Sequence, residues 1–161
     1  MKIALLPGSY DPITAGHFDI ALRAAEIFDL VVIAVMQNAE KKYMFSIEER
    51  YEAAKAAFCL DDRFRVIRSE GLLAQLLKDL EEEYDDAKCV LVKGLRNTTD
   101  FTYEYEMYEI NKAIRSCETI FIPSKKEHMF ISSTFVRELI KYGEDFSPFV
   151  PPNSYKYLKK N

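Results

Sequence analysis

The stretch that decides the fold of this chain is Pro7-Gly8-Ser9-Tyr10-Asp11-Pro12-Ile13-Thr14-Ala15-Gly16-His17. It follows a short apolar run, Ile3–Leu6, that predicts a buried strand, and it precedes an amphipathic helical pattern. A strand, a glycine-bearing turn and a helix start, in that order, place backbone N–H groups within reach of phosphate in α/β proteins. Because His17 lies in the first turn of the expected helix, the stretch predicts phosphate chemistry at this point.

Five short apolar runs recur along the chain, and helical patterns separate them. Their nearly continuous apolar character is typical of parallel strands that are covered on both faces. The expected strands are Ile3–Leu6, Leu30–Met36, Phe64–Arg68, Cys89–Lys93 and Thr119–Ile122. This alternation predicts one α/β domain over residues 1–161: a Rossmann-like open parallel five-stranded sheet with helices on both faces, and a C-terminal helix from about residue 152.

Apolar stripes at helical spacing fill the segments between these strands. One stripe begins at Phe18, and another begins after Ser46, which forms a capping-box pattern with Glu49 three residues later. A leucine-rich stripe covers residues 72–80, and a further stripe ends at Gly143. Helices are therefore expected in each of these segments.

The helical pattern after Asp100 is apolar on two faces, one of which carries Phe101, Tyr105 and Tyr108. Such a helix has more surface to bury than one contact with a sheet provides. Two interpretations stay open from the sequence. The helix is either packed deeply in the fold or part of a subunit interface, where Tyr, Phe and Met are favoured.

Composition limits the partners of this chain. Its net charge is −4 at pH 7, whereas a nucleic-acid interface is usually basic and clustered, so we expect no nucleic-acid partner. Anionic substrates must then be held by a few placed groups rather than by the overall field. No apolar run approaches ~20 residues, so we expect no membrane span.

The cysteines indicate a cellular compartment. Cys59, Cys89 and Cys117 show no CxxC spacing, and each lies in or near an apolar run, which favours buried thiols in a reducing environment. No N-terminal signal region is visible, because Met1-Lys2 leads directly into the first expected strand. We therefore expect a cytoplasmic protein.

Basic and hydroxyl residues follow several of the expected strands. Lys41 follows the second strand, Lys93-Gly94-Leu95-Arg96 closes the fourth, and the hydroxyls of Ser132–Thr134 open the helix after the fifth. The carboxyl ends of parallel strands meet at one edge of a sheet, where ligands bind. Transfer of a phosphate-bearing group needs in-line positioning and charge neutralisation, which Lys, Arg, His and a helix N-terminus can supply.

Four blocks, in order, carry a resemblance that covers essentially the full chain: PGSYDPITAGH, KKYMFSIEER, VKGLRNTTDFTYE and MFISSTFVR. With the Thr14-x-Gly16-His17 motif they resemble the bacterial phosphopantetheine adenylyltransferases of the T/HxGH nucleotidyltransferase superfamily. The resemblance implies that AMP passes from ATP to 4′-phosphopantetheine, giving dephospho-coenzyme A and pyrophosphate. It also implies Mg²⁺ with ATP, a homohexamer, feedback by coenzyme A, and no nucleophile or general base from the protein. We assign no metal ligand to the side chains.

The resemblance also implies roles for individual residues. His17 and Lys41 would be catalytic, His17 by stabilising the transition state and Lys41 by contacting the substrate phosphate and the reacting phosphoryl group. The substrate-binding residues would be Ser9, Lys41, Leu73 and Lys93. The ATP-binding residues would be Ser9, Tyr10, His17, Gly94, Leu95, Arg96, Glu104, His128, Met129, Phe130, Ile131, Ser132, Ser133 and Thr134.

Several positions depart from the common family pattern or leave alternatives open. Lys93 stands where Arg is usual, which keeps the charge but loses the planar fork. Ser9 stands where Thr is common, which keeps the hydroxyl. The loop 123–130 is about a residue longer than in some relatives, so either Glu127 or His128 lies against the nucleotide. The ring of Tyr10 either closes over a ligand or only packs.

The sequence disfavours three rival functions. A nicotinamide mononucleotide adenylyltransferase or a cytidylyltransferase is disfavoured by the KGLR block and the segment 100–104. A non-catalytic nucleotide-binding module would lack a phosphate-binding group at the sheet edge, yet His17, Lys41 and Arg96 are all present. An RNA-binding fragment of synthetase type is disfavoured by the acidic charge and the length of one domain.

Overall fold

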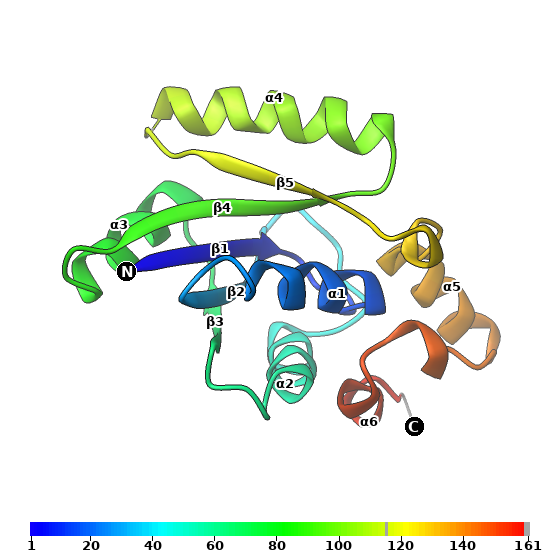
Figure 1. The fold of residues 1–161 in the computed structure, drawn as a ribbon. Helices are drawn as coiled ribbons and strands as arrows, with labels where there is room; N and C mark the ends of the chain where they lie inside the picture. Colours follow the sequence, from blue (N-terminus) through cyan, green and yellow to red (C-terminus); the bar gives the residue numbers. More distant parts are fainter. Residues whose placement is uncertain (115, 160–161) are drawn as a thin grey trace.

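Five parallel strands form one sheet in the order β3-β2-β1-β4-β5 in the computed structural model, which describes residues 1–114 and 116–159 (Figure 1). Their bounds are β1 Lys2–Gly8, β2 Leu30–Met36, β3 Phe64–Ser69, β4 Lys88–Leu95 and β5 Thr119–Pro123. Each predicted strand lies within an observed one or coincides with it. The predicted open parallel five-stranded sheet is confirmed.

The described residues form six α-helices and three short 3-10 turns. They are α1 Ala15–Ala24, α2 Ile47–Ala57, α3 Leu73–Glu83, α4 Thr98–Ile114, η1 Lys126–His128, α5 Ser133–Tyr142, η2 Ser147–Phe149, η3 Pro152–Ser154 and α6 Tyr155–Leu158. The capping box that opens α2 is confirmed: the Glu49 N–H donates to Ser46 Oγ at 3.2 Å, and the Ser46 N–H donates to Glu49 Oε2 at 2.7 Å. Gly143, with a φ of 73°, ends α5 as predicted.

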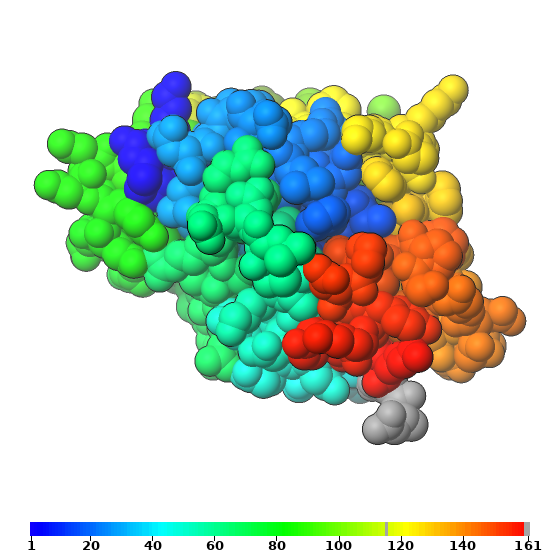
Figure 2. Space-filling view, turned by 60° about the horizontal axis from the view of Figure 1, so that its bottom comes forward, coloured from blue at the N-terminus to red at the C-terminus, as the bar shows by residue number. Residues whose placement is uncertain are grey.

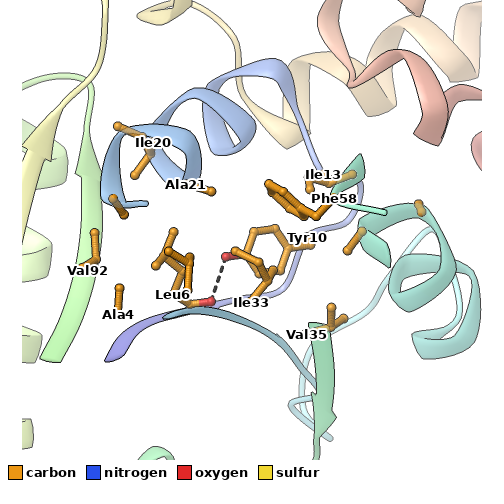
Figure 3. Close-up of a cluster of buried hydrophobic side chains, with 14 of the residues drawn as sticks. Ala4, Leu6, Tyr10, Ile13, Ile20, Ala21, Ile33, Val35, Phe58 and Val92 are labelled. Atoms are coloured by element: carbon orange, nitrogen blue, oxygen red, sulfur yellow. Dashed lines mark hydrogen bonds between the residues drawn. The ribbon is translucent and has the colours of Figure 1, made fainter. Parts of the chain in front are cut away.

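The side chains of β1 alternate between two apolar clusters, one on each face of the sheet. Ala4 and Leu6 join a cluster with α1 and α2, whereas Ile3 and Leu5 join a second cluster with α3. Figure 3 shows the first of these clusters, with α1 lying over β1 and its neighbours. Because both faces of the strands are covered, their continuous apolar character is explained, and the predicted helices on both faces are confirmed.

The C-terminal segment closes one side of the first cluster. η3 and α6 pack against α2, and the buried Ser154 donates its hydroxyl to the Ala53 carbonyl at 2.7 Å. Figure 2 shows this segment in red, lying against neighbouring parts of the chain that are distant in sequence. α2 is therefore held between the sheet and the chain's last described residues.

One of the two open interpretations of α4 fails, and two side chains expected in apolar clusters, Cys59 and Leu72, are exposed. α4 has no buried residue, and Phe101, Tyr105 and Ile110 are exposed, so the deeply packed interpretation of this helix fails. Cys59 is exposed while the other two cysteines are buried, because it lies in the turn just after α2. Leu72 is exposed because it precedes the first turn of α3. Among the residues described, no helix combines the length and apolar character that a membrane span requires.

Candidate active site

A cavity of about 480 Å³ lies beside the carboxyl ends of β1 and β4. These strands are neighbours in the sheet, and the strand order changes direction between them. In open α/β sheets this switch point is where the crevice for ligands forms. The first turns of α1 and α5 line the same cavity, so two helix N-termini with their partial positive charges meet there.

The Thr14-x-Gly16-His17 motif forms a capping box at the start of α1. The His17 N–H donates to Thr14 Oγ1 at 3.3 Å, and the Thr14 N–H donates to His17 Nδ1 at 3.1 Å. His17 therefore takes the place that Glu or Gln holds in an ordinary capping box. The motif fixes the ring of His17 while it starts the helix.

The environment of His17 keeps its imidazole neutral. Burial, and then the positive charge of Arg96, lower the pKa of His17 from 6.5 to about 4. Since Nδ1 accepts the Thr14 N–H, the proton of the neutral ring sits on Nε2. His17 can thus donate a hydrogen bond to an anionic oxygen without carrying a charge of its own.

Tyr10 shapes the turn that precedes α1. Its φ of 48° lies in the left-handed region, its side chain is buried, and its hydroxyl donates to the Leu6 carbonyl at 2.8 Å (Figure 3). Its ring meets the ring of His17 edge to face at 5.1 Å. A Cβ on Gly8 would lie 3.0 Å from this ring, so the close approach favours glycine there. Of the two interpretations, the structure favours packing.

Lys41 reaches the cavity from the loop after β2. Its ammonium group donates to Ser9 Oγ at 3.1 Å, which joins this loop to the turn after β1. The neighbouring Lys42 is exposed and is not among the lining residues. The structure thus selects one of the two adjacent lysines for the cavity.

Two cations at the end of β4 are paired with carboxylates from α4. Lys93 Nζ lies 3.2 Å from Glu104 Oε2. Arg96 donates through Nε and Nη2 to the two oxygens of Asp100 at 2.9 and 3.1 Å. The first turns of α4 therefore orient both basic side chains toward one wall of the cavity, and they partly neutralise them.

The start of α5 is fastened to the turn after β1. Ser132 caps the helix by accepting the Phe135 N–H at 3.0 Å, and Ser133 donates its hydroxyl to the Pro12 carbonyl at 2.8 Å. Arg137 donates to the Asp11 carbonyl at 2.6 Å. These bonds bring the N-terminus of α5 beside that of α1.

The loop before α5 settles which of two candidate side chains faces the cavity. His128 lines it, whereas Glu127 is exposed and lies outside the lining set. His128 Nδ1 is buried and has no hydrogen-bond partner within the described chain. This atom is therefore available to a ligand.

Most of the residues that the sequence assigns to the site line this one cavity. They are Ser9, Tyr10, His17, Lys41, Lys93, Gly94, Arg96, Glu104, His128, Ile131, Ser132, Ser133 and Thr134. Four assigned residues are outside the lining set, namely Leu73, Leu95, Met129 and Phe130. Leu73 packs at the start of α3 against the second apolar cluster, and Met129 and Phe130 are exposed.

Asp11, Asp100, Tyr103 and Arg137 are among the other lining residues, to which the sequence reasoning assigned no role in the site. The spacing of four between Arg96, just before α4, and Asp100, in its first turn, is a signal that could have found that pair. Asp11 gives no such signal, because an Asp before Pro indicates only a turn. Its carboxylate accepts the Met44 and Phe45 N–H groups, each at 2.9 Å, and so binds the loop after β2.

Three carboxylates reach the cavity, and each faces a basic side chain. Asp100 pairs with Arg96 and Glu104 pairs with Lys93, while Asp11 lies 3.8 Å from Arg137. In the part of the chain that the structure describes, no group of three His, Cys, Asp or Glu side chains is placed to hold a metal. The cavity instead presents N–H, hydroxyl and cationic groups, which suit phosphate.

The amino-acid sequence of this chain is similar to those of known proteins over nearly its whole length. The cytidylyltransferase-like family model matches residues 5–139. A phosphopantetheine adenylyltransferase of Buchnera aphidicola subsp. Schizaphis graminum is 42% identical over 161 residues, which cover 99% of this chain and 94% of the relative. Another, from Limosilactobacillus reuteri, is 39% identical, with coverage of 99% and 90%. A third, from Streptomyces coelicolor, is 40% identical, with coverage of 94% and 92%.

Comparison of structures supports the fold. A Vibrio parahaemolyticus protein assigned as a nicotinate-nucleotide adenylyltransferase superposes with a TM-score of 0.69 over 98% of this chain and 91% of its own. At 21% identity, this likeness shows the Rossmann-like fold alone. The near-complete sequence matches go further: this chain belongs to the phosphopantetheine adenylyltransferase family, within the cytidylyltransferase-like nucleotidyltransferases.

Proposed function

We propose that this protein transfers AMP from ATP to 4′-phosphopantetheine, giving dephospho-coenzyme A and pyrophosphate. The observation that carries the proposal is the convergence of His17, Lys41, Lys93 and Arg96 with two helix N-termini on one cavity. Such a set can neutralise a triphosphate and an acceptor phosphate together. Family membership supplies the identity of the two substrates.

The reaction needs no covalent intermediate on the protein. An oxygen of the phosphopantetheine phosphate attacks the α-phosphorus of ATP in line, and the bond from that phosphorus to the bridging oxygen breaks. Pyrophosphate leaves with the electron pair. The protein contributes positioning and charge stabilisation, as in other phosphoryl transfers.

The resemblance to the family and the positions of the side chains support individual roles within this proposal. The neutral ring of His17 donates its Nε2 proton to a phosphate oxygen, and Lys41 adds a positive charge beside the reacting phosphoryl group. Lys93 and Ser9 hold the acceptor phosphate. Arg96 and the start of α5 hold the phosphates of ATP, with His128 beside the nucleotide.

We propose that Mg²⁺ enters with ATP, coordinated by the phosphates of the nucleotide. The cavity carboxylates support this assignment, because Asp11, Asp100 and Glu104 each already face a basic side chain. Hard oxygen ligands for Mg²⁺ then come from ATP and water, which is its common mode in phosphoryl transfer. The ion is part of the substrate rather than a resident cofactor.

We also propose that the chain works in the cytoplasm as a homohexamer. Exposed apolar side chains on two faces of α4, Phe101 and Tyr105 on one and Ile110 and Ile114 on the other, support assembly, because aromatic and apolar side chains are enriched at subunit interfaces. Size-exclusion chromatography with light scattering measures the mass of the assembly directly. A monomer at micromolar concentration would refute the assembly.

The test of the reaction is pyrophosphate release from ATP and Mg²⁺ with 4′-phosphopantetheine, and with nicotinamide mononucleotide in parallel. We expect pyrophosphate release when phosphopantetheine is the acceptor and none when nicotinamide mononucleotide is. Release only with nicotinamide mononucleotide would overturn the substrate assignment.

His17→Ala should lower kcat by about 10²–10³-fold with the fold intact, since it removes one donor to the transition state. Coenzyme A, which contains the product's groups, should compete in the same assay.

A further inference from the structure

Arg50, in α2, is a charged side chain with no exposed surface. Its guanidinium donates to the backbone carbonyls of Ser9 at 2.6 Å, Met36 at 2.9 Å and Phe45 at 3.2 Å. It also donates to Oε1 of Gln37. Burying a charge is costly unless placed polar groups satisfy it, and here four carbonyl or amide oxygens do so.

The acceptors of Arg50 come from three segments that meet beside the cavity. Ser9 belongs to the turn after β1, Met36 ends β2, and Phe45 lies just before α2. Only a planar fork with several N–H groups can bond to all of them at once, and the single ammonium of a lysine cannot. Arg50 thus fixes how the turn after β1 and the loop after β2 lie against each other.

That loop, residues 37–46, carries Lys41 and is held on both sides of it. The ring of Tyr43 stacks on the Arg50 guanidinium at 4.0 Å, and its hydroxyl accepts the Asn38 N–H at 2.9 Å. On the other side, Asp11 accepts the N–H groups of Met44 and Phe45. The position of the Lys41 ammonium therefore depends on contacts that lead back to Arg50.

The partner of Lys41 depends on the same side chain. Lys41 donates to Ser9 Oγ, and Arg50 bonds to the carbonyl of that residue. The next residue, Tyr10, is in the left-handed region with a φ of 48°, which few side chains adopt without support from their surroundings. Arg50 therefore supports both ends of the contact between Lys41 and Ser9.

We infer that Arg50 is a positioning residue for nucleotidyl transfer, one that holds Lys41 against the turn after β1 where the reacting phosphates bind. This inference rests on the function proposed above, in which Lys41 contacts the reacting phosphoryl group. Arg50 itself is buried behind the turn and is not among the residues that line the cavity. Its effect on the reaction passes through Lys41 and Ser9.

A double-mutant cycle between Arg50→Lys and Lys41→Ala tests the inference. We expect Arg50→Lys to lower kcat by about 10²-fold, the cost of a misplaced group, with little change in the affinity for ATP. In the Lys41→Ala background the same substitution should add almost nothing, since residues that act as one unit are not additive. Arg68→Lys is the matched control: Arg68 also contacts α2, through Tyr51 and Glu48, and it lies outside the cavity.

Losses that multiply in the double variant, or a normal kcat in Arg50→Lys, would overturn the inference. A normal kcat in Lys41→Ala would instead refute the proposed role of Lys41. Hydrogen exchange supplies a readout that needs no turnover: the amides of residues 37–46 should exchange faster in Arg50→Lys, while those of the sheet keep their protection. Unchanged exchange in that loop would contradict the inference even if the reaction proved to be a different one.

Tyr43→Leu covers the case in which Arg50→Lys fails to fold. This substitution removes the ring that stacks on Arg50 and the acceptor of the Asn38 N–H, at a half-buried position outside the cavity. It should reproduce both the fall in kcat and the lack of additivity with Lys41→Ala. Full activity in a folded Tyr43→Leu protein, with unchanged exchange in the loop, would count against the inference.

Discussion

The ammonium group of Lys41 lies 3.1 Å from Ser9 Oγ, a contact between residues that are 32 positions apart in the chain. The other cationic side chains of the cavity stand beside carboxylates: Lys93 beside Glu104, Arg96 beside Asp100 and Arg137 beside Asp11. Within residues 1–114 and 116–159, Lys41 has no carboxylate partner of this kind. Its charge is therefore the one most available to an incoming anion.

Lys41→Ala should weaken the use of phosphopantetheine more than the binding of ATP. The substitution removes a charge assigned to the acceptor phosphate and the reacting phosphoryl group, so we expect kcat/KM for phosphopantetheine to fall by about 10²–10³-fold. Steady-state kinetics and calorimetric titration with ATP measure the two effects separately. Lys42→Ala, at an exposed neighbour outside the cavity, is the control. Equal losses for both substrates would contradict the placement of Lys41.

His17 should titrate far below an ordinary histidine. Burial and the charge of Arg96 lower the pKa of His17 to about 4, so we expect an NMR titration midpoint near that pH in the free protein. The chain has only two histidines, so a His128→Gln variant identifies the signal. Adding ATP should raise the midpoint, because a nearby anion favours the protonated ring. A midpoint near 6.5 in the free protein would show that the ring is neither buried nor next to a cation.

The same pKa has a consequence for stability. The unfolded chain takes up a proton at His17 below about pH 6.5, whereas the folded protein does so only near pH 4. His17 therefore leaves the free energy of unfolding unaffected above pH 6.5 and lowers it as the pH falls from 6.5 to 4, by at most about 3 kcal/mol. Urea unfolding of the wild type and of His17→Asn across this range isolates the effect. Parallel pH curves for the two proteins would contradict it.

The layout of the fold was predictable because burial on both faces leaves a continuous apolar pattern in each strand. The apolar run Leu30–Met36, for example, predicts the bounds of β2 without error. The burial of α4 was not predictable, because periodicity shows that a helix has an apolar face but not what covers it. Phe101, for example, meets Phe121 of β5 at 5.9 Å and still remains exposed.

The sequence predicts those site residues that directly follow the carboxyl ends of strands. His17, Lys41 and Arg96 follow strands whose carboxyl ends meet, so the sequence brings them to one edge. The sequence did not predict the roles of Arg50 and Asp11, because their hydrogen-bond partners lie far along the chain. Arg50 bonds to Ser9 across 41 positions, and Asp11 bonds to Phe45 across 34. In sequence, Arg50 follows Glu48 and Glu49 and resembles an ordinary surface charge on a helix.

Thr14→Ala should reduce both stability and turnover. The hydroxyl of Thr14 caps α1 and contacts His17 Nδ1 at 3.0 Å, and removing an N-cap hydroxyl costs about 1 kcal/mol. We expect kcat to fall as well, since the ring of His17 loses one of the two groups that orient it. Thr14→Ser keeps the hydroxyl and should restore most of both quantities, as measured by thermal unfolding and by pyrophosphate release. Loss of stability with unchanged kcat would mean that the backbone N–H of Thr14 alone orients the ring.

Asp100→Asn should weaken ATP binding by misplacing Arg96. Asp100 accepts two bonds from the guanidinium and one from the Arg96 backbone N–H, so it sets the direction in which the guanidinium points. An asparagine keeps the shape but presents only one oxygen, so a bidentate pair becomes at best a single bond. We expect the Kd for ATP to rise several-fold, with a small change in kcat.

The opposite sign is the informative alternative for Asp100→Asn. If Asp100 acts mainly as a counter-ion that competes with the triphosphate for Arg96, the substitution frees the guanidinium and ATP binds more tightly. Calorimetric titration with ATP at two salt concentrations separates the cases. Salt screening weakens the competition from the Asp100 charge, but it does not restore the orientation of Arg96. Asp79→Asn, which removes a carboxylate that accepts a bond from Gln75 on the exposed side of α3, controls for the change in net charge. Tighter binding of ATP by Asp100→Asn at low salt would show that Asp100 acts mainly as a counter-ion that competes with ATP for Arg96.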